Sequence, residues 1–255
     1  MKVMIMKTAA TLALGLSLTS AALAEGASEA FKGVSPALQR YGQEALANGL
    51  WTRPGLSARD RSVVTLSAVI TANHTAMLAD QVKLALDNGV KPAEVSEIIT
   101  HLAFYAGWGN AVAAAEAAKA VFAERGIDAG QLPKALPVLL PLDEAAEATR
   151  AARVEEITGP ASPGLVRDTA EVLFRDLWLR PDLAPRDRSL VTVSALVASG
   201  QVAQIPYHLN RAMDNGLKRD EASEALSQLA YYAGWPKAFS AAPVFREVFE
   251  KRPVE

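Results

Sequence analysis

The spacing of apolar residues along this chain is helical. In one stretch, Leu190, Val193 and Val197 recur at intervals of three to four residues, which places their side chains on one face of an α-helix. The same periodicity predicts helices at about residues 202–214 and 219–232. No segment has the alternating pattern of a half-buried strand. The predicted fold class is therefore all-α.

The helical pattern occurs twice along the chain. The sequence RDRSVVTLSAVITA at residues 59–72 is repeated as RDRSLVTVSALVAS at residues 186–199. A shift of 127 residues aligns residues 50–111 with 177–238 without a gap, and 29 of the 62 aligned pairs are identical. A unit of about 90 residues is far longer than a solenoid repeat. The chain is therefore predicted to hold two tandem copies of one helical bundle.

Proline residues separate the two copies. Pro133, Pro137 and Pro141 interrupt the segment that follows Gly126, and proline breaks a helix because it lacks a backbone N–H group and clashes with the preceding turn. We expect the first repeat at residues 25–126, a linker with a connecting helix at 127–156, and the second repeat at 157–255.

The repeated helix has recognisable capping residues. Ser57 is predicted to cap the first copy, with Asp60 three residues later, and Pro185 suits the first position of the second copy. Arginines also lie in these first turns, where the positive end of the helix dipole disfavours a cation. They are Arg59, Arg61, Arg186 and Arg188. Each needs a specific partner, and the alternatives are a carboxylate within or between the units and a carboxylate-bearing ligand.

The first 24 residues have the layout of a secretory signal peptide. Lys2 and Lys7 precede an apolar stretch that ends in Ala22-Leu23-Ala24, the small-residue pattern of a cleavage site. We expect cleavage after Ala24 and a periplasmic or secreted location. The apolar stretch is short for a membrane span and no other stretch is long enough, so no membrane association is expected after cleavage.

Composition narrows the possible chemistry. The 255-residue chain has a formal net charge of −2, so a basic surface for a nucleic-acid partner is not expected. It contains no cysteine, which excludes disulfides, catalytic thiolates and cysteine-ligated metals. We predict neither a cofactor nor a metal site.

The histidines mark positions where the two copies differ. His74, His101 and His208 align with Gln201, Gln228 and Gln81 in the other copy. Histidine titrates near neutral pH, so His208 is a candidate general acid or base; the alternative is a histidine on a polar helix face without a chemical role. His101 lies one helical turn after Glu97, and the two could hydrogen-bond along their helix. A metal site that adds His74 is disfavoured, because this spacing is common by chance.

The order of these motifs resembles the carboxymuconolactone decarboxylase family. RDRSLVTVSALVAS is followed by His208, by AMDNGL at residues 212–217 and by EASEALSQLAYYAGWPKA at residues 221–238. The resemblance covers most of the chain beyond the signal sequence. It implies an all-α bundle of the AhpD-like (alkylhydroperoxidase D-like) type, whose single-domain members form ring-like homo-oligomers, commonly hexamers. A duplicated chain is then expected to form a homotrimer that builds a pseudo-hexamer.

The resembled family contains two chemistries. Its alkylhydroperoxidase D-like branch uses a CxxC pair, and those positions fall on Gln201 and Gln204 in one copy and on His74 and Met77 in the other. A thiol peroxidase activity is therefore not expected. The other branch decarboxylates 4-carboxymuconolactone without a cofactor, which needs a cationic grip on a carboxylate and a group that moves a proton.

The resemblance assigns these roles to particular residues of the second copy. His208 and Arg188 match the family pattern as catalytic residues, and Glu224 is expected to orient them or to hold a second proton. The expected substrate contacts are Arg186, Gln204, Tyr232 and Trp235. If the three catalytic candidates converge, we expect a cofactor-free lyase or isomerase that acts on a small carboxylated or lactone compound. The alternatives are a non-catalytic exported small-molecule-binding protein and a structural oligomer.

Overall fold

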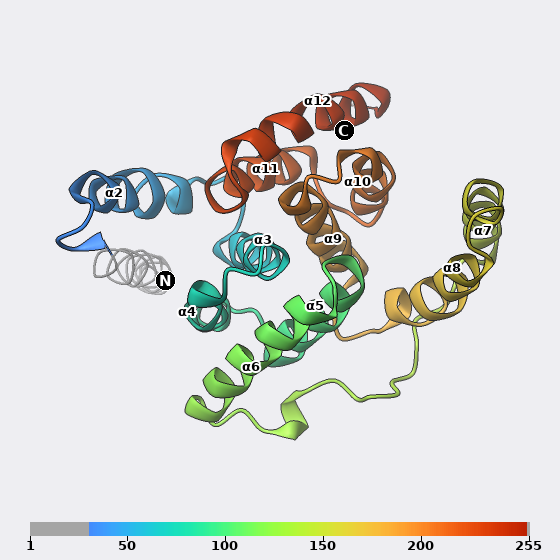
Figure 1. Cartoon of the computed structure of the whole chain (residues 1–255), viewed down its shortest axis with the longest axis horizontal. Coiled ribbons are helices and arrows are strands. Elements are labelled where there is room, and N and C mark those ends of the chain that lie inside the picture. The colour runs from blue at the N-terminus through green and yellow to red at the C-terminus, as the bar shows by residue number, and fades with distance from the viewer. Residues whose placement is uncertain (1–30, 254–255) are drawn as a thin grey trace, which may run out of the picture.

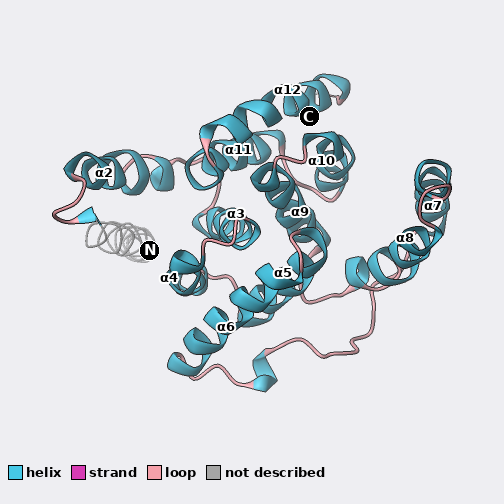
Figure 2. Cartoon of the chain, in the orientation of Figure 1, coloured by secondary structure: helices cyan, strands magenta, loops and turns pink. Residues whose placement is uncertain are grey.

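The computed structural model describes residues 31–253, and every regular element within them is a helix (Figure 1, Figure 2). The predicted all-α class is confirmed for this part of the chain. The predicted signal peptide, residues 1–24, lies outside the described residues. The longer elements are α2 (Pro36–Tyr41), α3 (Ala58–Thr71), α4 (Thr75–Asp87), α5 (Pro92–Tyr105), α6 (Trp108–Glu124), α7 (Glu144–Thr158), α8 (Pro163–Asp168), α9 (Pro185–Ser199), α10 (Ile205–Asp214), α11 (Arg219–Ala233) and α12 (Trp235–Lys251). Short π-helical or 3₁₀ segments are η1 (Gly42–Ala47), η2 (Leu50–Thr52), η3 (Ala129–Gln131), η4 (Thr169–Phe174), η5 (Leu177–Leu179) and η6 (Val202–Gln204).

Helices α3 and α9, which carry the repeated RDRS motif, pack against each other at the centre of the molecule (Figure 1). Their side chains are buried almost throughout, because helices of both units surround them. Ser57 caps α3, since its hydroxyl accepts a hydrogen bond from the Asp60 N–H at 3.1 Å. Pro185 occupies the first position of α9. Both predictions about the helix starts are confirmed.

Helices of each unit pack against helices of the other unit. Helix α5 of the first unit contacts α9 as well as α3, and α11 of the second unit contacts α3 as well as α9. One apolar core therefore draws on both units, with Val64, Ile98, Val191 and Leu229 among its members. Burial of each such side chain contributes roughly 1.5–3 kcal/mol. The halves of the chain thus depend on each other for much of their buried surface.

The connecting segment leads to a helical arm beside the main body. After η3, the Leu140 N–H donates to the carbonyl of Leu179 at 2.8 Å, which fastens the connector to the start of the second unit. Helices α7 and α8 follow and project to the right of the bundle in Figure 1. Helix α7 ends at Thr158. The repeat limits at residues 25–126, 127–156 and 157–255 stay predictions.

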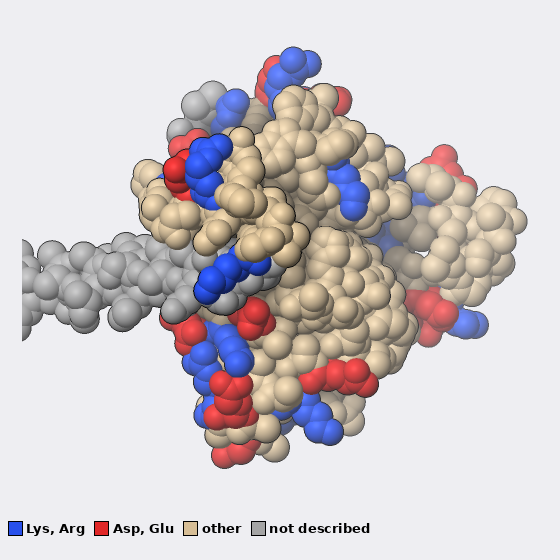
Figure 3. Space-filling model, turned by 60° about the vertical axis from the view of Figure 1, so that its left-hand side comes forward, with Lys and Arg blue, Asp and Glu red and all other residues tan. Residues whose placement is uncertain are grey.

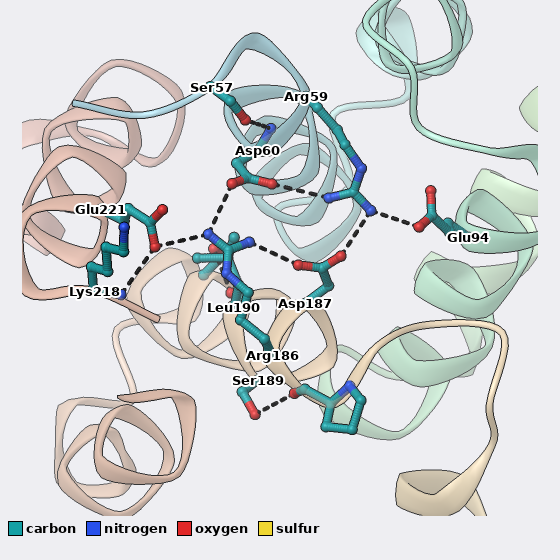
Figure 4. Close-up of polar contacts among 12 residues, drawn as sticks. Ser57, Arg59, Asp60, Glu94, Arg186, Asp187, Ser189, Leu190, Lys218 and Glu221 are labelled. Carbon is teal, nitrogen blue, oxygen red and sulfur yellow. Dashed lines mark hydrogen bonds and ion pairs between the residues drawn. The ribbon is translucent and has the colours of Figure 1, made fainter. Parts of the chain in front are cut away.

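A central ion-pair cluster joins the first turns of α3 and α9 (Figure 4). Arg59 pairs with Asp187 at 2.7 Å and with Glu94 at 2.6 Å, and in the same way Arg186 pairs with Asp60 at 2.9 Å and with Glu221 at 3.0 Å. Burial by itself would lower the pKa of Arg59, but the charges and hydrogen bonds of Asp187 and Glu94 together outweigh burial and raise that pKa. These carboxylates explain why arginine is stable at the positive end of a helix.

This cluster corrects the prediction for Arg186. Its guanidinium donates to Asp60, Asp187 and Glu221, so the side chain holds the two units together instead of contacting a substrate. Of the two kinds of partner considered for these arginines, a carboxylate of the protein is the one observed for Arg59 and Arg186.

Candidate active site

His208 lies in a buried aromatic environment. It is in the first turn of α10 and is 8% exposed. Its ring stacks on Trp178 with centroids 5.8 Å apart, and it meets Tyr105 and Tyr207 edge-on at 5.6 and 5.0 Å. The expectation of a polar, accessible helix face was wrong, because Trp178 of η5 and Tyr105 of the first unit's α5 cover this position.

A fully buried ion pair lies close to these rings. Arg188 Nη2 is 2.8 Å from Glu97 Oε2, and both side chains are 0% exposed. The same nitrogen donates to the carbonyl oxygen of Arg180 at 2.9 Å, and the Arg180 guanidinium also pairs with Glu97. The sequence predicts that Arg188 holds the substrate and acts with Glu224. The structure corrects this: Arg188 is engaged inside the protein, and its carboxylate partner is Glu97.

His101 is held in one tautomer by the same network. Its Nε2 is 2.7 Å from the hydroxyl oxygen of Thr192, whose own proton goes to the carbonyl of Arg188. Nε2 must therefore donate, and Nδ1 is left to accept the longer contact of 3.5 Å from Arg188 Nη1. Burial, followed by the charge of Arg188, lowers the pKa of His101 well below its usual value. The predicted hydrogen bond between His101 and Glu97 is absent, since both side chains turn to Arg188.

The aligned residues of the two repeats form a second, equivalent network. Arg61 donates to Glu224 and Gln228 at 3.0 Å each, and Gln228 donates to Thr65 at 2.9 Å. Trp51 donates to the Tyr232 hydroxyl at 3.0 Å, as Trp178 does to Tyr105 at 2.9 Å. Glu224 and Tyr232, predicted to act with His208, thus belong to this second network. We call the two networks the His208 centre and the Gln81 centre, after the aligned residues.

Arg211 is a cation of the His208 centre that has no carboxylate partner among the described residues. Its guanidinium carbon lies 4.4 Å from the Trp178 ring centroid and 5.6 Å from that of Phe174. The Arg211 side chain forms no hydrogen bond or ion pair with another described residue. Burial, and after it the charge of Arg211, lowers the pKa of His208 to about 4. His208 is therefore neutral at neutral pH, and its buried Nδ1 has no hydrogen-bond partner in the described structure.

The duplicated bundle and its paired networks agree with comparisons of the whole sequence. The model of the carboxymuconolactone decarboxylase family matches residues 36–120 and again residues 163–247. The chain belongs to the carboxymuconolactone decarboxylase family.

Two curated relatives are decarboxylases. A 4-carboxymuconolactone decarboxylase of Acinetobacter baylyi is 36% identical over 75 residues, which are 29% of this chain and 56% of that protein. A nitrosuccinic acid decarboxylase of Metarhizium robertsii is 33% identical over 79 residues, 29% of this chain and 55% of that protein. The chain thus matches these relatives over about half of their length.

The two centres of this carboxymuconolactone decarboxylase family member have diverged in composition. His208 and His101, which come from different units, lie in the same centre, because both rings contact Tyr105 and Trp178. Gln228 lies in the other centre, and Gln81 is aligned with His208. His74 takes no part in either network; it is exposed and precedes α4. The histidine differences between the repeats therefore concentrate in one centre.

Two predicted substrate contacts lie outside the network around His208. Gln204 is exposed at the end of η6, and Trp235 is half exposed at the start of α12, where its ring packs on Tyr231. Neither forms a hydrogen bond or a ring contact with His208. Between residues 31 and 253 no group of three or more metal-ligating side chains is assembled, and no helix is long and apolar enough to cross a membrane.

Proposed function

We propose that this protein is a cofactor-free lyase that decarboxylates a small carboxylated or lactone compound at the His208 centre, and that it is not a thiol peroxidase. The observation that carries the proposal is a buried neutral histidine with an unpartnered Nδ1 beside Arg211, a cation without an anion. Unpartnered buried polar groups cost stability, and a bound carboxylate would satisfy the arginine. Membership of the family and two decarboxylase relatives support the reaction type.

The proposed reaction uses few groups. Arg211 holds and orients the substrate through a carboxylate. The bond to the departing carboxylate breaks, its electron pair stays on the substrate carbon and is delocalised into a conjugated carbonyl, and CO₂ leaves. With the substrate bound, the neutral His208 first takes up a proton from solvent and then transfers it to that carbon, so the net reaction consumes one proton. Because a substrate anion offsets the charge of Arg211, it raises the lowered pKa of His208 and favours this transfer.

The buried groups behind His208 act as positioning residues. His101 stacks on Tyr105 with centroids 4.7 Å apart and meets Trp178 edge-on at 5.1 Å. Because Arg188 contacts both His101 and Glu97, the ion pair fixes the rings against which His208 packs. Arg188 and Glu97 therefore shape the site without touching the substrate.

Turnover with a matched control tests this proposal. The substrates are 4-carboxymuconolactone and nitrosuccinate, with CO₂ release as the measurement. His208→Gln installs the residue that the first unit carries, and it should reduce kcat by about 10²–10⁴-fold. Gln81→Ala alters the aligned position and should leave kcat within about twofold of the wild-type value, because it removes no proton-transfer group. Full turnover by His208→Gln, or no CO₂ from either substrate with the wild type, refutes the proposal; specific binding without turnover would favour the small-molecule-binding alternative.

We also propose that the chain self-associates as a homotrimer and is exported. On the face in Figure 3, charged side chains of both signs border a broad surface without charge. Exposed Trp108 and Val112 of one unit align with exposed Trp235 and Phe239 of the other, so two equivalent apolar surfaces are available for copies of the chain. Light scattering should give three times the chain mass. Export predicts a purified periplasmic form that begins at Glu25.

A further inference from the structure

The connecting helix α7 packs in an unusual way. Helices normally dock through an apolar stripe, but the buried residues of α7 are Glu147 and Arg150. The Arg150 guanidinium carbon lies 4.2 Å from the Phe174 ring centroid. The helix thus places a buried charged pair against the aromatic residues that lead to the His208 centre.

Arg150 has one donor group to spare. Glu147 accepts from Arg150 Nε and Nη2 at 2.7 Å each, which leaves Nη1 buried and without a partner in the described structure. An arginine placed only to neutralise Glu147 could leave its remaining donor in water. Burial of a free N–H group costs stability, so this arrangement calls for a ligand acceptor.

The free donor belongs to the environment of His208. Phe174 is parallel to Trp178 with centroids 5.8 Å apart, and Trp178 stacks on His208. Arg150 and Arg211 both lie near the Phe174 ring, so their guanidinium carbons are no further apart than the sum of those two distances. Unpartnered buried atoms therefore cluster here: Arg150 Nη1, Arg211 Nε and His208 Nδ1.

We propose that the connecting helix is part of the ligand site and that Arg150 holds a second carboxylate of the molecule bound at Arg211. The ligand is then a small dicarboxylate, because each arginine takes one anionic group. Arg150 is a specificity-determining residue that discriminates against monocarboxylates of similar size. This inference rests on the proposed function in that it places the ligand at Arg211 beside His208, but it does not require that the ligand is decarboxylated.

Calorimetry with succinate and butyrate tests the role of Arg150. Wild-type protein should bind succinate more tightly than butyrate. The double variant Glu147→Gln/Arg150→Met removes both charges, so neither is left buried alone. It should weaken succinate binding by about 10- to 100-fold, the loss expected for a charge-assisted hydrogen bond, and change butyrate binding by less than about twofold. Arg153→Met removes an exposed cation from the same helix and serves as the control for general charge effects.

The outcomes separate this inference from the proposed reaction. Three outcomes overturn the role of Arg150. They are an unchanged succinate affinity in the double variant, an equal loss of affinity in Arg153→Met, and no succinate binding by the wild type. Decarboxylation can still be present in each of those cases. Conversely, succinate selection through Arg150 without CO₂ release from any substrate overturns only the reaction.

Discussion

The buried ion pair between Glu97 and Arg188 can be tested against its counterpart. Glu97 and Arg188 are both 0% exposed, and removal of one partner from such a pair leaves an uncompensated buried charge at a cost of about 3–5 kcal/mol. Glu97→Ala should therefore lower the free energy of unfolding by that amount. A domain is stable by only about 5–15 kcal/mol, so the loss should be large.

Glu224→Ala is the matched comparison in the Gln81 centre. Glu224 is 24% exposed, and its second partner Arg53 is 45% exposed. After its removal Arg61 still donates to Gln228 and to the carbonyl of Arg53, and water can reach the space. We expect a smaller loss of about 1–3 kcal/mol.

Urea unfolding followed by far-UV circular dichroism measures both losses. The variants must be compared at one protein concentration, because self-association would make stability depend on it. Glu97→Gln keeps hydrogen-bond acceptors without the charge and should fall between Glu97→Ala and the wild type. Equal losses for Glu97→Ala and Glu224→Ala, or a Glu97→Ala loss below about 1 kcal/mol, would refute the argument that burial sets the difference.

Three further measurements follow from the structure. The pKa of His208 is about 4 in the folded protein, whereas its ordinary value is 6.5. Between these pH values the unfolded chain binds more protons than the folded protein. The free energy of unfolding therefore decreases as the pH falls from 6.5 toward 4, by up to about 3 kcal/mol for this residue. His208→Gln should flatten that fall in urea titrations at pH 7 and 4.5, and an unchanged slope contradicts the assignment. A Cβ on Gly55 would lie 2.5 Å from Glu224 Cγ, so Gly55→Ala should cost about 1–3 kcal/mol, whereas Gly109→Ala, with open space around it, should not destabilise the protein. Light scattering that shows a monomer would contradict the proposed trimer.

Local patterns predict much of the fold. The three- to four-residue spacing of Leu190, Val193 and Val197 lies on α9, and Ser57 caps α3 as its position before an apolar helix suggests. The predicted helix at residues 219–232 is observed as Arg219–Ala233. These features depend on neighbours in sequence, which periodicity and capping rules describe.

The site was harder to predict because its contacts are long-range. Nothing in the sequence indicates that Glu97 crosses to Arg188 while Glu224 crosses to Arg61, since both pairings depend on how the units interlock. The burial of His208 was missed for the same reason. One signal in the sequence could have pointed to Arg211. It aligns with Leu84 of the first copy, so the second copy carries a cation where the first copy has a buried apolar side chain.

Each centre is built from residues of both units, and this has an evolutionary consequence. If a single gene encoded one unit that paired with its own copy, every substitution would appear in both sites at once. Tandem fusion removes that constraint, because Glu97 and Glu224, or His101 and Gln228, can then mutate separately. One site can specialise while the other keeps only the packing that holds the pair together. The same interlocking means that neither half, expressed alone, would contain a whole site.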